Sequence, residues 1–171
     1  AVDFKDNAQL LLSRTAEAEI LRGKGRSYGA EFYIRKNKGK LTGSASYTLS
    51  WTEFKINGIN EGNYYFAPWD RRHNFVLSLS YEFNSRVFAG ANWSYMTGRP
   101  ITLAVAGYEF DNTYGQFITG RNAQRTPDFH RLDLSLSVKS KQKEGRKWNG
   151  MWNFSVYNAY YRKNPFSVYI E

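Results

Sequence analysis

The feature that most restricts the fold of this chain is an alternation of apolar and polar residues that returns in separate segments. In residues 41–51 the even positions are all threonine or serine, while the odd positions include Leu49 and Trp51. The same period recurs in residues 74–83 and 131–139. A period of two places neighbouring side chains on opposite faces of a strand and matches no helix. The sequence therefore predicts an all-β fold whose strands have one apolar and one polar face.

The polar positions favour a membrane sheet over a soluble one. They are mostly Ser, Thr, Asn and Gly, whereas a soluble sheet usually presents Lys, Glu and Arg to water. Small neutral side chains suit a hydrated lumen or a plug, so the apolar side chains would face outer-membrane lipid. Aromatic residues gather near the strand ends, as at membrane interfaces. Each run spans roughly 9 to 12 residues, which is enough for a tilted strand to cross a bilayer. We expect antiparallel transmembrane β-barrel strands.

Composition excludes several other classes. The 171 residues include no cysteine, so a disulfide framework, a thiolate metal site and a cysteine nucleophile are excluded. No apolar run is long enough for a transmembrane helix. The net charge of +9 is scattered over turns and strand ends without a continuous stripe, so we expect no nucleic-acid binding. Residues 1–12 lack the pattern of a signal peptide, so we expect a mature chain or a piece of a longer one.

The predicted organisation has two parts. Residues 1–25 form a poorly defined strand or loop region, and residues 26–171 form the barrel segment. Short connections near residues 38, 84 and 143 alternate with long ones near 60 and 110, an asymmetry typical of outer-membrane barrels. We count seven strands, or eight if the apolar cluster at residues 10–12 contributes one. The main runs are 27–35, 41–54, 74–83, 87–95, 131–139 and 148–156.

Seven short motifs follow one another in a fixed order along the chain. They are GRSYGAE (25–31), GKLTG (39–43), YTLS (47–50), DRRH (70–73), YMTGRP (95–100), HRLD (130–133) and YNAY (157–160). Together they resemble the C-terminal part of a TonB-dependent outer-membrane receptor, from the branch with a carboxypeptidase-regulatory-like domain before the plug. The resemblance covers nearly the whole chain, although none of the motifs is catalytic.

The resemblance implies a location in the outer membrane of a Gram-negative bacterium and a barrel of about 22 strands with its lumen blocked by a plug. This chain would supply seven or eight of those strands, and the remainder of the receptor, including the plug, would be its partner. Extracellular loops would capture a siderophore, glycan or peptide, and the TonB complex would act through the plug. No enzyme activity and no cofactor are implied. Whether a surface lipoprotein lid covers the barrel stays open.

Two alternatives remain at this stage. A self-contained outer-membrane barrel of eight strands, with an anchoring or structural role, would fit the strand count. A soluble β-sandwich that binds sugars would also alternate, although an exposed apolar belt argues against it.

The best candidates for substrate contact lie in the long connection that follows residue 97. Loops on a rigid scaffold often carry binding, and aromatic and arginine side chains suit sugars, peptides or anionic ligands. These candidates are Tyr108, Tyr114, Arg121, Asn122 and Arg125.

Two charged groups invite a catalytic or metal interpretation, but structural ion pairs are more common. We expect Asp70 to pair with Arg72 where a long loop enters a strand, and Arg131 to pair with Asp133 on the lumen face. The chain has two histidines, whereas metal sites usually need three or more ligands, so we expect no metal site.

Overall fold

The computed structural model describes residues 22–110, 113–118, 120–141 and 148–165. Regular structure in these ranges consists of strands and one 3₁₀ turn, η2. The strands are rich in alternating β-branched, aromatic and hydroxyl side chains, which suit a pleated surface. The elements are β1 (Gly23–Lys36), β2 (Leu41–Ile56), η2 (Asn60–Gly62), β3 (Tyr65–Phe66), β4 (His73–Asn84), β5 (Val87–Met96), β6 (Pro100–Ile101), β7 (Ala104–Phe110), β8 (Thr113–Ile118), β9 (Gln124–Arg125), β10 (Phe129–Lys139) and β11 (Met151–Val156).

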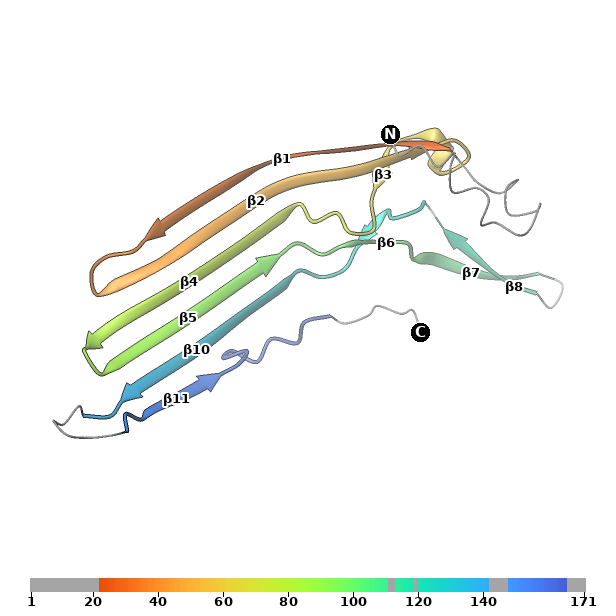
Figure 1. The fold of residues 1–171 in the computed structure, drawn as a ribbon. Coiled ribbons are helices and arrows are strands. Elements are labelled where there is room, and N and C mark those ends of the chain that lie inside the picture. Colours follow the sequence, from red (N-terminus) through yellow and green to blue (C-terminus); the bar gives the residue numbers. More distant parts are fainter. Residues whose placement is uncertain (1–21, 111–112, 119, 142–147, 166–171) are drawn as a thin grey trace, which may run out of the picture.

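One antiparallel sheet dominates the structure, in the order β1-β2-β4-β5-β10-β11 (Figure 1). Each long strand pairs with the next one along the chain, and β3 pairs with the far end of β2. β6 pairs with β9, and β7 pairs with β8. The all-β, antiparallel prediction is therefore confirmed. Over the described residues the main sheet is open, with β1 at one edge and β11 at the other.

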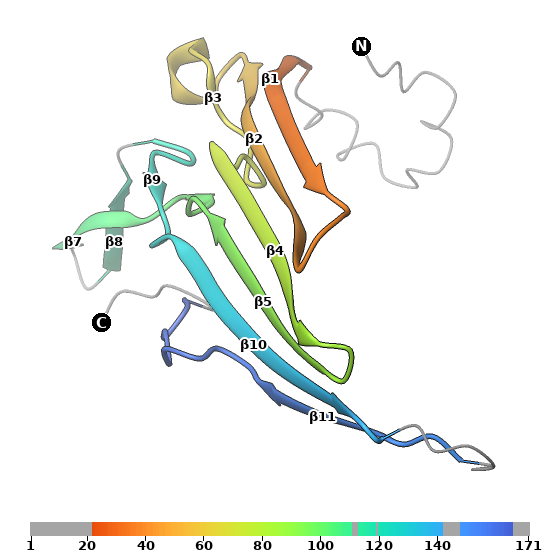
Figure 2. The same cartoon turned by 90° about the vertical axis from the view of Figure 1, so that its left-hand side faces the viewer.

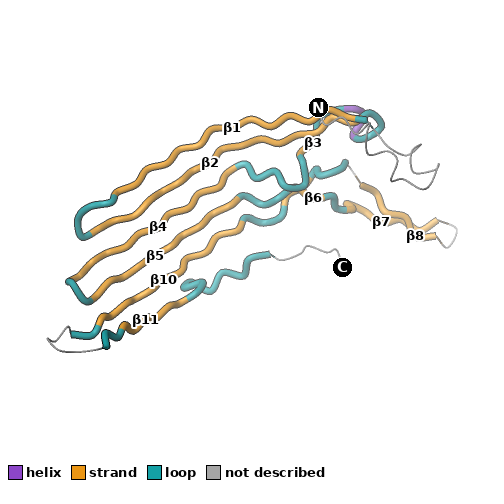
Figure 3. Tube along the Cα trace, in the orientation of Figure 1, coloured by secondary structure: helices purple, strands orange, loops and turns teal. Residues whose placement is uncertain are grey.

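The register keeps the two predicted faces separate across the whole sheet. Tyr47 of β2 lies opposite Phe32 of β1 and Phe75 of β4, so apolar side chains share one face. On the other face, Ser44 lies opposite Ser78, which in turn lies opposite Asn92. Figure 3 shows the continuous pleat that this alternation requires. We call these surfaces the apolar face and the polar face.

The two ends of the sheet differ in their connections. The turns from β1 to β2 and from β4 to β5 are tight, and the β10–β11 connection lies at the same end (Figure 2). At Gly39, φ is 93°, a conformation that glycine adopts without strain. The opposite end carries the two long connections, 57–72 and 97–128, with β3, β9 and the β7–β8 hairpin.

The structure differs from the sequence prediction in two places, at the start of the first strand and within the longest connection. β1 begins at Gly23, before the predicted start of the barrel segment at residue 26. The connection 97–128, predicted as a loop, contains four short strands. β6 and β9 have two residues each, which is too short to show a period. The additional strand considered at residues 10–12 lies outside the described residues.

The described part of the chain has almost no core of its own. Its buried apolar side chains are those of Tyr65, Ala67 and Pro100, all within the long connections. Large side chains on the apolar face remain open, such as Ile34 at 72% and Trp152 at 71% exposure. No helix in the described residues is long and apolar enough to cross a membrane. Because a sheet must bury its apolar face, this one requires a cover that the described residues do not provide.

Candidate functional site

The two long connections meet at one end of the main sheet and are joined there by side chains. We call this contact the loop junction and define it by Asn60, Phe66, Asp70, Asn122 and Arg125. Its hydrogen bonds, including those from Asn60 to Arg121, join residues 55 to 61 positions apart across the two connections. The junction therefore lies within the two connections, the longer of which holds the predicted substrate contacts.

Asn60 makes the outermost contact of the junction. Its Nδ2 donates to the carbonyl oxygen of Arg121 at 3.0 Å, and its Oδ1 accepts from the amide of Arg121 at 2.7 Å. A side-chain amide that bonds both backbone groups of one residue fixes that residue as a strand partner would. The exposed side chain of Arg121 is left pointing outward from a backbone that is held in place.

Asn122 lies next to this contact and is 7% exposed. Its Nδ2 donates to the carbonyl oxygen of Phe66 at 2.7 Å, and its backbone amide donates to Thr102 Oγ1 at 2.8 Å. Its φ of 56° lies in the left-handed region, which asparagine tolerates better than most residues. Asn122 therefore links β3 to the region of β6 and β9.

Asp70 and Arg125 form the innermost contact of the junction. Asp70 is 1% exposed, and its Oδ1 accepts from the backbone amide of Thr52 at 2.7 Å. Its Oδ2 accepts from Arg125 Nη2, while Arg125 Nη1 donates to the carbonyl oxygen of Gly98 at 2.9 Å. A buried carboxylate needs such a partner, because desolvation otherwise strongly disfavours its charge. One ion pair thus joins both long connections to β2.

The predicted pairing of Asp70 with Arg72 is wrong. β4 begins only at His73, and the amide of Asp70 donates to the carbonyl of Ala67 in a turn, so strand alternation does not apply between residues 70 and 72. Arg72 instead places its guanidinium 4.6 Å from the Trp51 ring centre. Cations are attracted to aromatic faces at this distance.

Arg131 and Asp133 do lie together on the polar face. Arg131 Nη2 is 2.9 Å from Asp133 Oδ2, and Arg131 Nε donates to the same oxygen at 3.0 Å. Arg131 also donates to the Tyr157 hydroxyl, and Asp133 Oδ1 accepts from the amide of Asn158 at 2.9 Å. The pair neutralises both charges and ties β10 to the segment that follows β11.

Asp128 and Thr97 are structural residues that the sequence prediction did not include. Asp128 Oδ2 accepts from the Tyr95 hydroxyl at 2.6 Å, and its Oδ1 accepts from the amide of Gly98 at 2.9 Å. The Tyr95 hydrogen bond is the main cause that lowers the pKa of the Asp128 carboxyl below its usual value. Thr97 Oγ1 accepts from the amide of His73 at 2.7 Å. For Asp128, the only signal in the sequence was its position as a carboxylate just before a predicted strand.

The structure divides the five predicted substrate contacts. Asn122 and Arg125 use their polar groups within the junction, which leaves Arg121 as an exposed candidate at its rim. Tyr108 in β7 and Tyr114 in β8 lie on the projecting hairpin, opposite Gly115 and Glu109 respectively, but their side chains lie outside the described residues. The geometry gives the two junction residues a role in rigid support, and their contact with a substrate stays a prediction.

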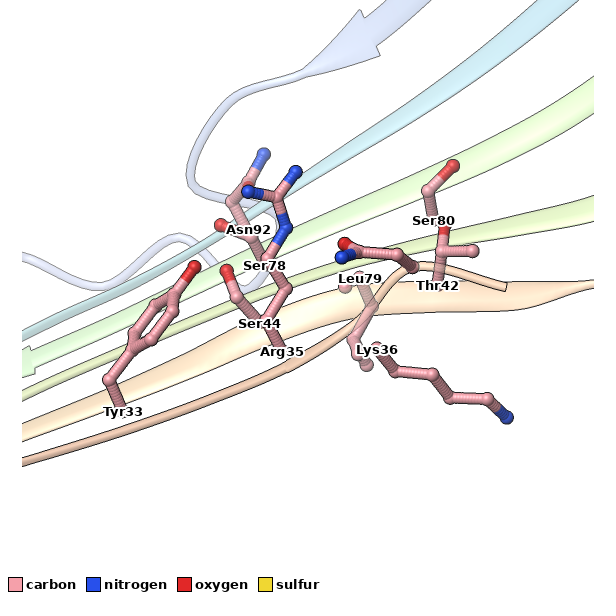
Figure 4. A pocket seen from close by; sticks show the side chains of 11 residues that line it. Tyr33, Arg35, Lys36, Thr42, Ser44, Ser78, Leu79, Ser80 and Asn92 are labelled. Atoms are coloured by element: carbon pink, nitrogen blue, oxygen red, sulfur yellow. The ribbon is translucent and has the colours of Figure 1, made fainter. Parts of the chain in front are cut away.

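The polar face contains a hollow of about 540 Å³ near the tight-turn end (Figure 4). Arg35, Ser44, Ser78 and Asn92 line it, and Figure 4 shows their side chains on the same side of the sheet. Within the described residues, no three His, Cys, Asp or Glu side chains are grouped so that they could hold a metal ion. The lining is polar and suits water or a polar polypeptide surface.

Comparison with known proteins gives no independent assignment. No protein-family model matches the chain. No curated protein matches it. No solved structure matches it either. The functional argument therefore rests on the two faces of the sheet, on its two different ends and on the sequence resemblance.

Proposed function

We propose that this chain forms part of the barrel wall and the extracellular loops of a TonB-dependent receptor in the outer membrane. The observation that carries the proposal is a two-faced antiparallel sheet whose apolar face has no cover within the described residues. Lipid provides such a cover for outer-membrane barrel strands, which alternate apolar-out and polar-in.

The dimensions of the strands support this proposal. β4, β5 and β10 have 12, 10 and 11 residues. A tilted transmembrane strand needs about 9 to 11 residues to cross the hydrocarbon. The central strands are therefore long enough to span a bilayer with one or two residues in the headgroup region.

Aromatic residues with polar partners lie on the apolar face toward the long connections. The hydroxyl of Tyr47 is 2.8 Å from His73 Nδ1, and Tyr160 contacts both His130 Nδ1 at 2.8 Å and Trp93 Nε1 at 3.3 Å. Amphipathic rings of this kind are enriched where hydrocarbon meets water. They support a membrane boundary at this level, with the loop junction on the aqueous side.

The polar face supports the assignment of the barrel interior. Its central positions carry hydroxyl and amide groups, and Arg131 and Asp133 neutralise each other. Such a wall is compatible with water or with a plug domain. In the mechanism that the resemblance implies, the loops capture a siderophore, glycan or peptide, and TonB then acts on the plug. The chain itself acts as a scaffold.

Cysteine labelling of the receptor that contains this chain would test the orientation of the sheet. Since the chain has no cysteine, Leu134→Cys and Ser135→Cys each create the one thiol of this segment, on opposite faces of β10, in a receptor whose other segments are made free of cysteine. In vesicles, we expect a fluorophore at position 134 to be quenched by lipid-borne nitroxides and one at position 135 by aqueous iodide. The reverse pattern, or two aqueous sites, would exclude a lipid-facing apolar surface.

Energised uptake needs a separate test. Cells that depend on the intact receptor for a limiting nutrient should lose uptake when TonB is removed, although the receptor stays in the outer membrane. Uptake that continues unchanged without TonB would reject the receptor class and leave a barrel with a passive or structural role.

A further inference from the structure

The apolar face changes its chemistry where β1 and β2 run beyond β4. The pairing of β2 with β4 ends at Leu49 and His73, whereas β1 and β2 stay paired as far as Gly23 and Ile56. This extension leads toward the end that carries the long connections (Figure 1). It is therefore the part of the hairpin that lies beyond the central strands.

Tyr28 and Trp51 are the last large apolar pair on this face, stacked with ring centres 5.3 Å apart. The following same-face pairs are Arg26 opposite Glu53 and Lys24 opposite Lys55. We call Lys24, Arg26, Glu53, Lys55 and Tyr64 the basic cluster.

Two of the three cations in the basic cluster have no carboxylate partner among the described residues. Arg26 Nε lies 2.7 Å from Glu53 Oε2, and its guanidinium is 3.9 Å from the Tyr64 ring centre. Lys24 and Lys55 face each other directly in the register and are both exposed. Like charges in directly opposed positions destabilise a strand pair, so an anion between them would relieve the repulsion.

We propose that the basic cluster binds the phosphate of a membrane-lipid headgroup. The inference rests on the proposed function, which turns this face toward lipid. A phosphate monoester carries a charge of about −1.5 to −2 at neutral pH, which matches the two lysines that have no carboxylate partner in the described part of the chain. Lys24 lies four positions beyond Tyr28, or about 13 Å along the strand, and less than that along the membrane normal because such strands are tilted.

The cluster combines two features of headgroup recognition. Lysines near a membrane surface attract anionic headgroups, and tyrosine and tryptophan rings occupy the adjoining interface. Tyr64 lies between the charges, since its ring centre is 5.6 Å from Lys55 Nζ as well as close to Arg26. A phosphorylated glycolipid of the outer leaflet would present its phosphate to the lysines and its acyl chains to the apolar face below.

The test uses the intact receptor in neutral detergent, titrated with bis-phosphorylated lipid A and observed by native mass spectrometry. The double variant Lys24→Ala/Lys55→Ala should bind about twenty-five-fold more weakly, since each lysine near an anionic headgroup contributes roughly a factor of five. Lys38→Ala/Lys40→Ala is the matched control, because it removes the same charge from the tight turn of the same hairpin. It should bind within about twofold of the unaltered receptor.

Three further arms identify the ligand chemistry and its source. Lys24→Arg/Lys55→Arg should retain binding, which separates charge from any packing defect. Dephosphorylated lipid A with the same acyl chains should bind weakly. Excess inorganic phosphate, or an acidic peptide, should fail to displace the lipid.

Several results would overturn the proposal. They are equal lipid binding by both alanine variants, undiminished binding of dephosphorylated lipid A, and full displacement by inorganic phosphate or by the acidic peptide. Heat modifiability in SDS distinguishes this failure from failure of the proposed function. Variants that remain heat-modifiable barrels but bind lipid A equally reject only the headgroup site, whereas a receptor that is never recovered as an outer-membrane barrel rejects the proposed function as well.

Discussion

The two ends of the main sheet are held together by different kinds of interaction. At the tight-turn end, Asn84 Oδ1 accepts from the amides of Arg86 and Val87, two and three residues away. At the other end, the Asp70–Arg125 and Phe66–Asn122 contacts join groups 55 and 56 residues apart and are partly buried, whereas the long-range side-chain contact at the tight turns, from Arg86 Nε to the carbonyl of Lys139, is exposed. The difference indicates that local chemistry closes one end, whereas tertiary contacts position the connections that would carry binding loops.

The largest expected effect comes from Asp70→Asn in the intact receptor. This change leaves the Arg125 guanidinium opposite a neutral amide where the carboxylate was fully buried. We expect a loss of about 3 kcal/mol in the free energy of unfolding, measured in urea, because one partner of a buried ion pair is removed.

Asp133→Asn is the matched control, since Asp133 and Arg131 are 24% and 29% exposed and solvent screens the pair. It should cost about 1 kcal/mol or less. Equal losses in the two variants would mean that the loop junction is no stronger than an ordinary surface contact.

A second comparison uses one asparagine from each end of the sheet. Asn122→Ala removes the donor of a partly buried hydrogen bond to the Phe66 carbonyl and places alanine at a φ of 56°. We expect a loss of about 2 kcal/mol. Asn84→Ala, at an exposed turn, should cost about 0.5 to 1 kcal/mol.

Asn122→Gly separates the two contributions at the junction, because glycine keeps the backbone conformation and loses only the side-chain bonds. Urea unfolding of the three variants provides the measurement. A greater loss for Asn84→Ala than for Asn122→Ala would reverse the proposed distinction between the two ends.

A smaller effect is expected at the glycines with positive φ. Gly39 has a φ of 93° in the tight turn, and Gly58 has a φ of 83° in a long connection. An added Cβ would meet no atom within 4 Å at either position. Alanine should therefore cost about 1 kcal/mol at each site, from backbone strain alone.

The consequences of these two substitutions should differ in kinetics. We expect Gly39→Ala to slow folding, because the turn sets the β1–β2 register, and Gly58→Ala chiefly to speed unfolding. Stopped-flow folding into detergent micelles would measure both rates. If the two variants divided their loss of stability between the folding and unfolding rates in the same proportion, the kinetic part of the comparison would be wrong.

The sequence could predict the sheet because its signal is local. Alternation in residues 41–51 identifies both faces of β2, and Asn37 to Lys40 identifies the turn that fixes its register with β1. The junction could not be predicted in the same way. Asp70 and Arg125 carry no pattern that links them, and the adjacent Arg72 was a closer partner in sequence than the true one. Short bridges such as β6 and β9 exist only because the connections are already held together.

The smallest expected effect concerns pH and sharpens the comparison through Asp128. The Tyr95 hydroxyl lowers the pKa of this carboxyl in the folded protein, so the unfolded chain binds the proton more readily. The resulting stabilisation is present above the ordinary carboxyl pKa and is lost as the pH falls through the lower folded value.

Tyr95→Phe removes the donor. The deficit of this variant in the free energy of unfolding, relative to the unaltered receptor, should therefore shrink as urea unfolding is repeated from roughly pH 6 to pH 3. Tyr81→Phe, on β4 toward the tight turns, should show no such trend because the described structure gives its hydroxyl no carboxylate partner. A Tyr95→Phe deficit that stays constant with pH would mean that this hydrogen bond does not favour the charged form, and the long-connection end would then owe its stability to Asp70 and Asn122 without an electrostatic contribution from Asp128.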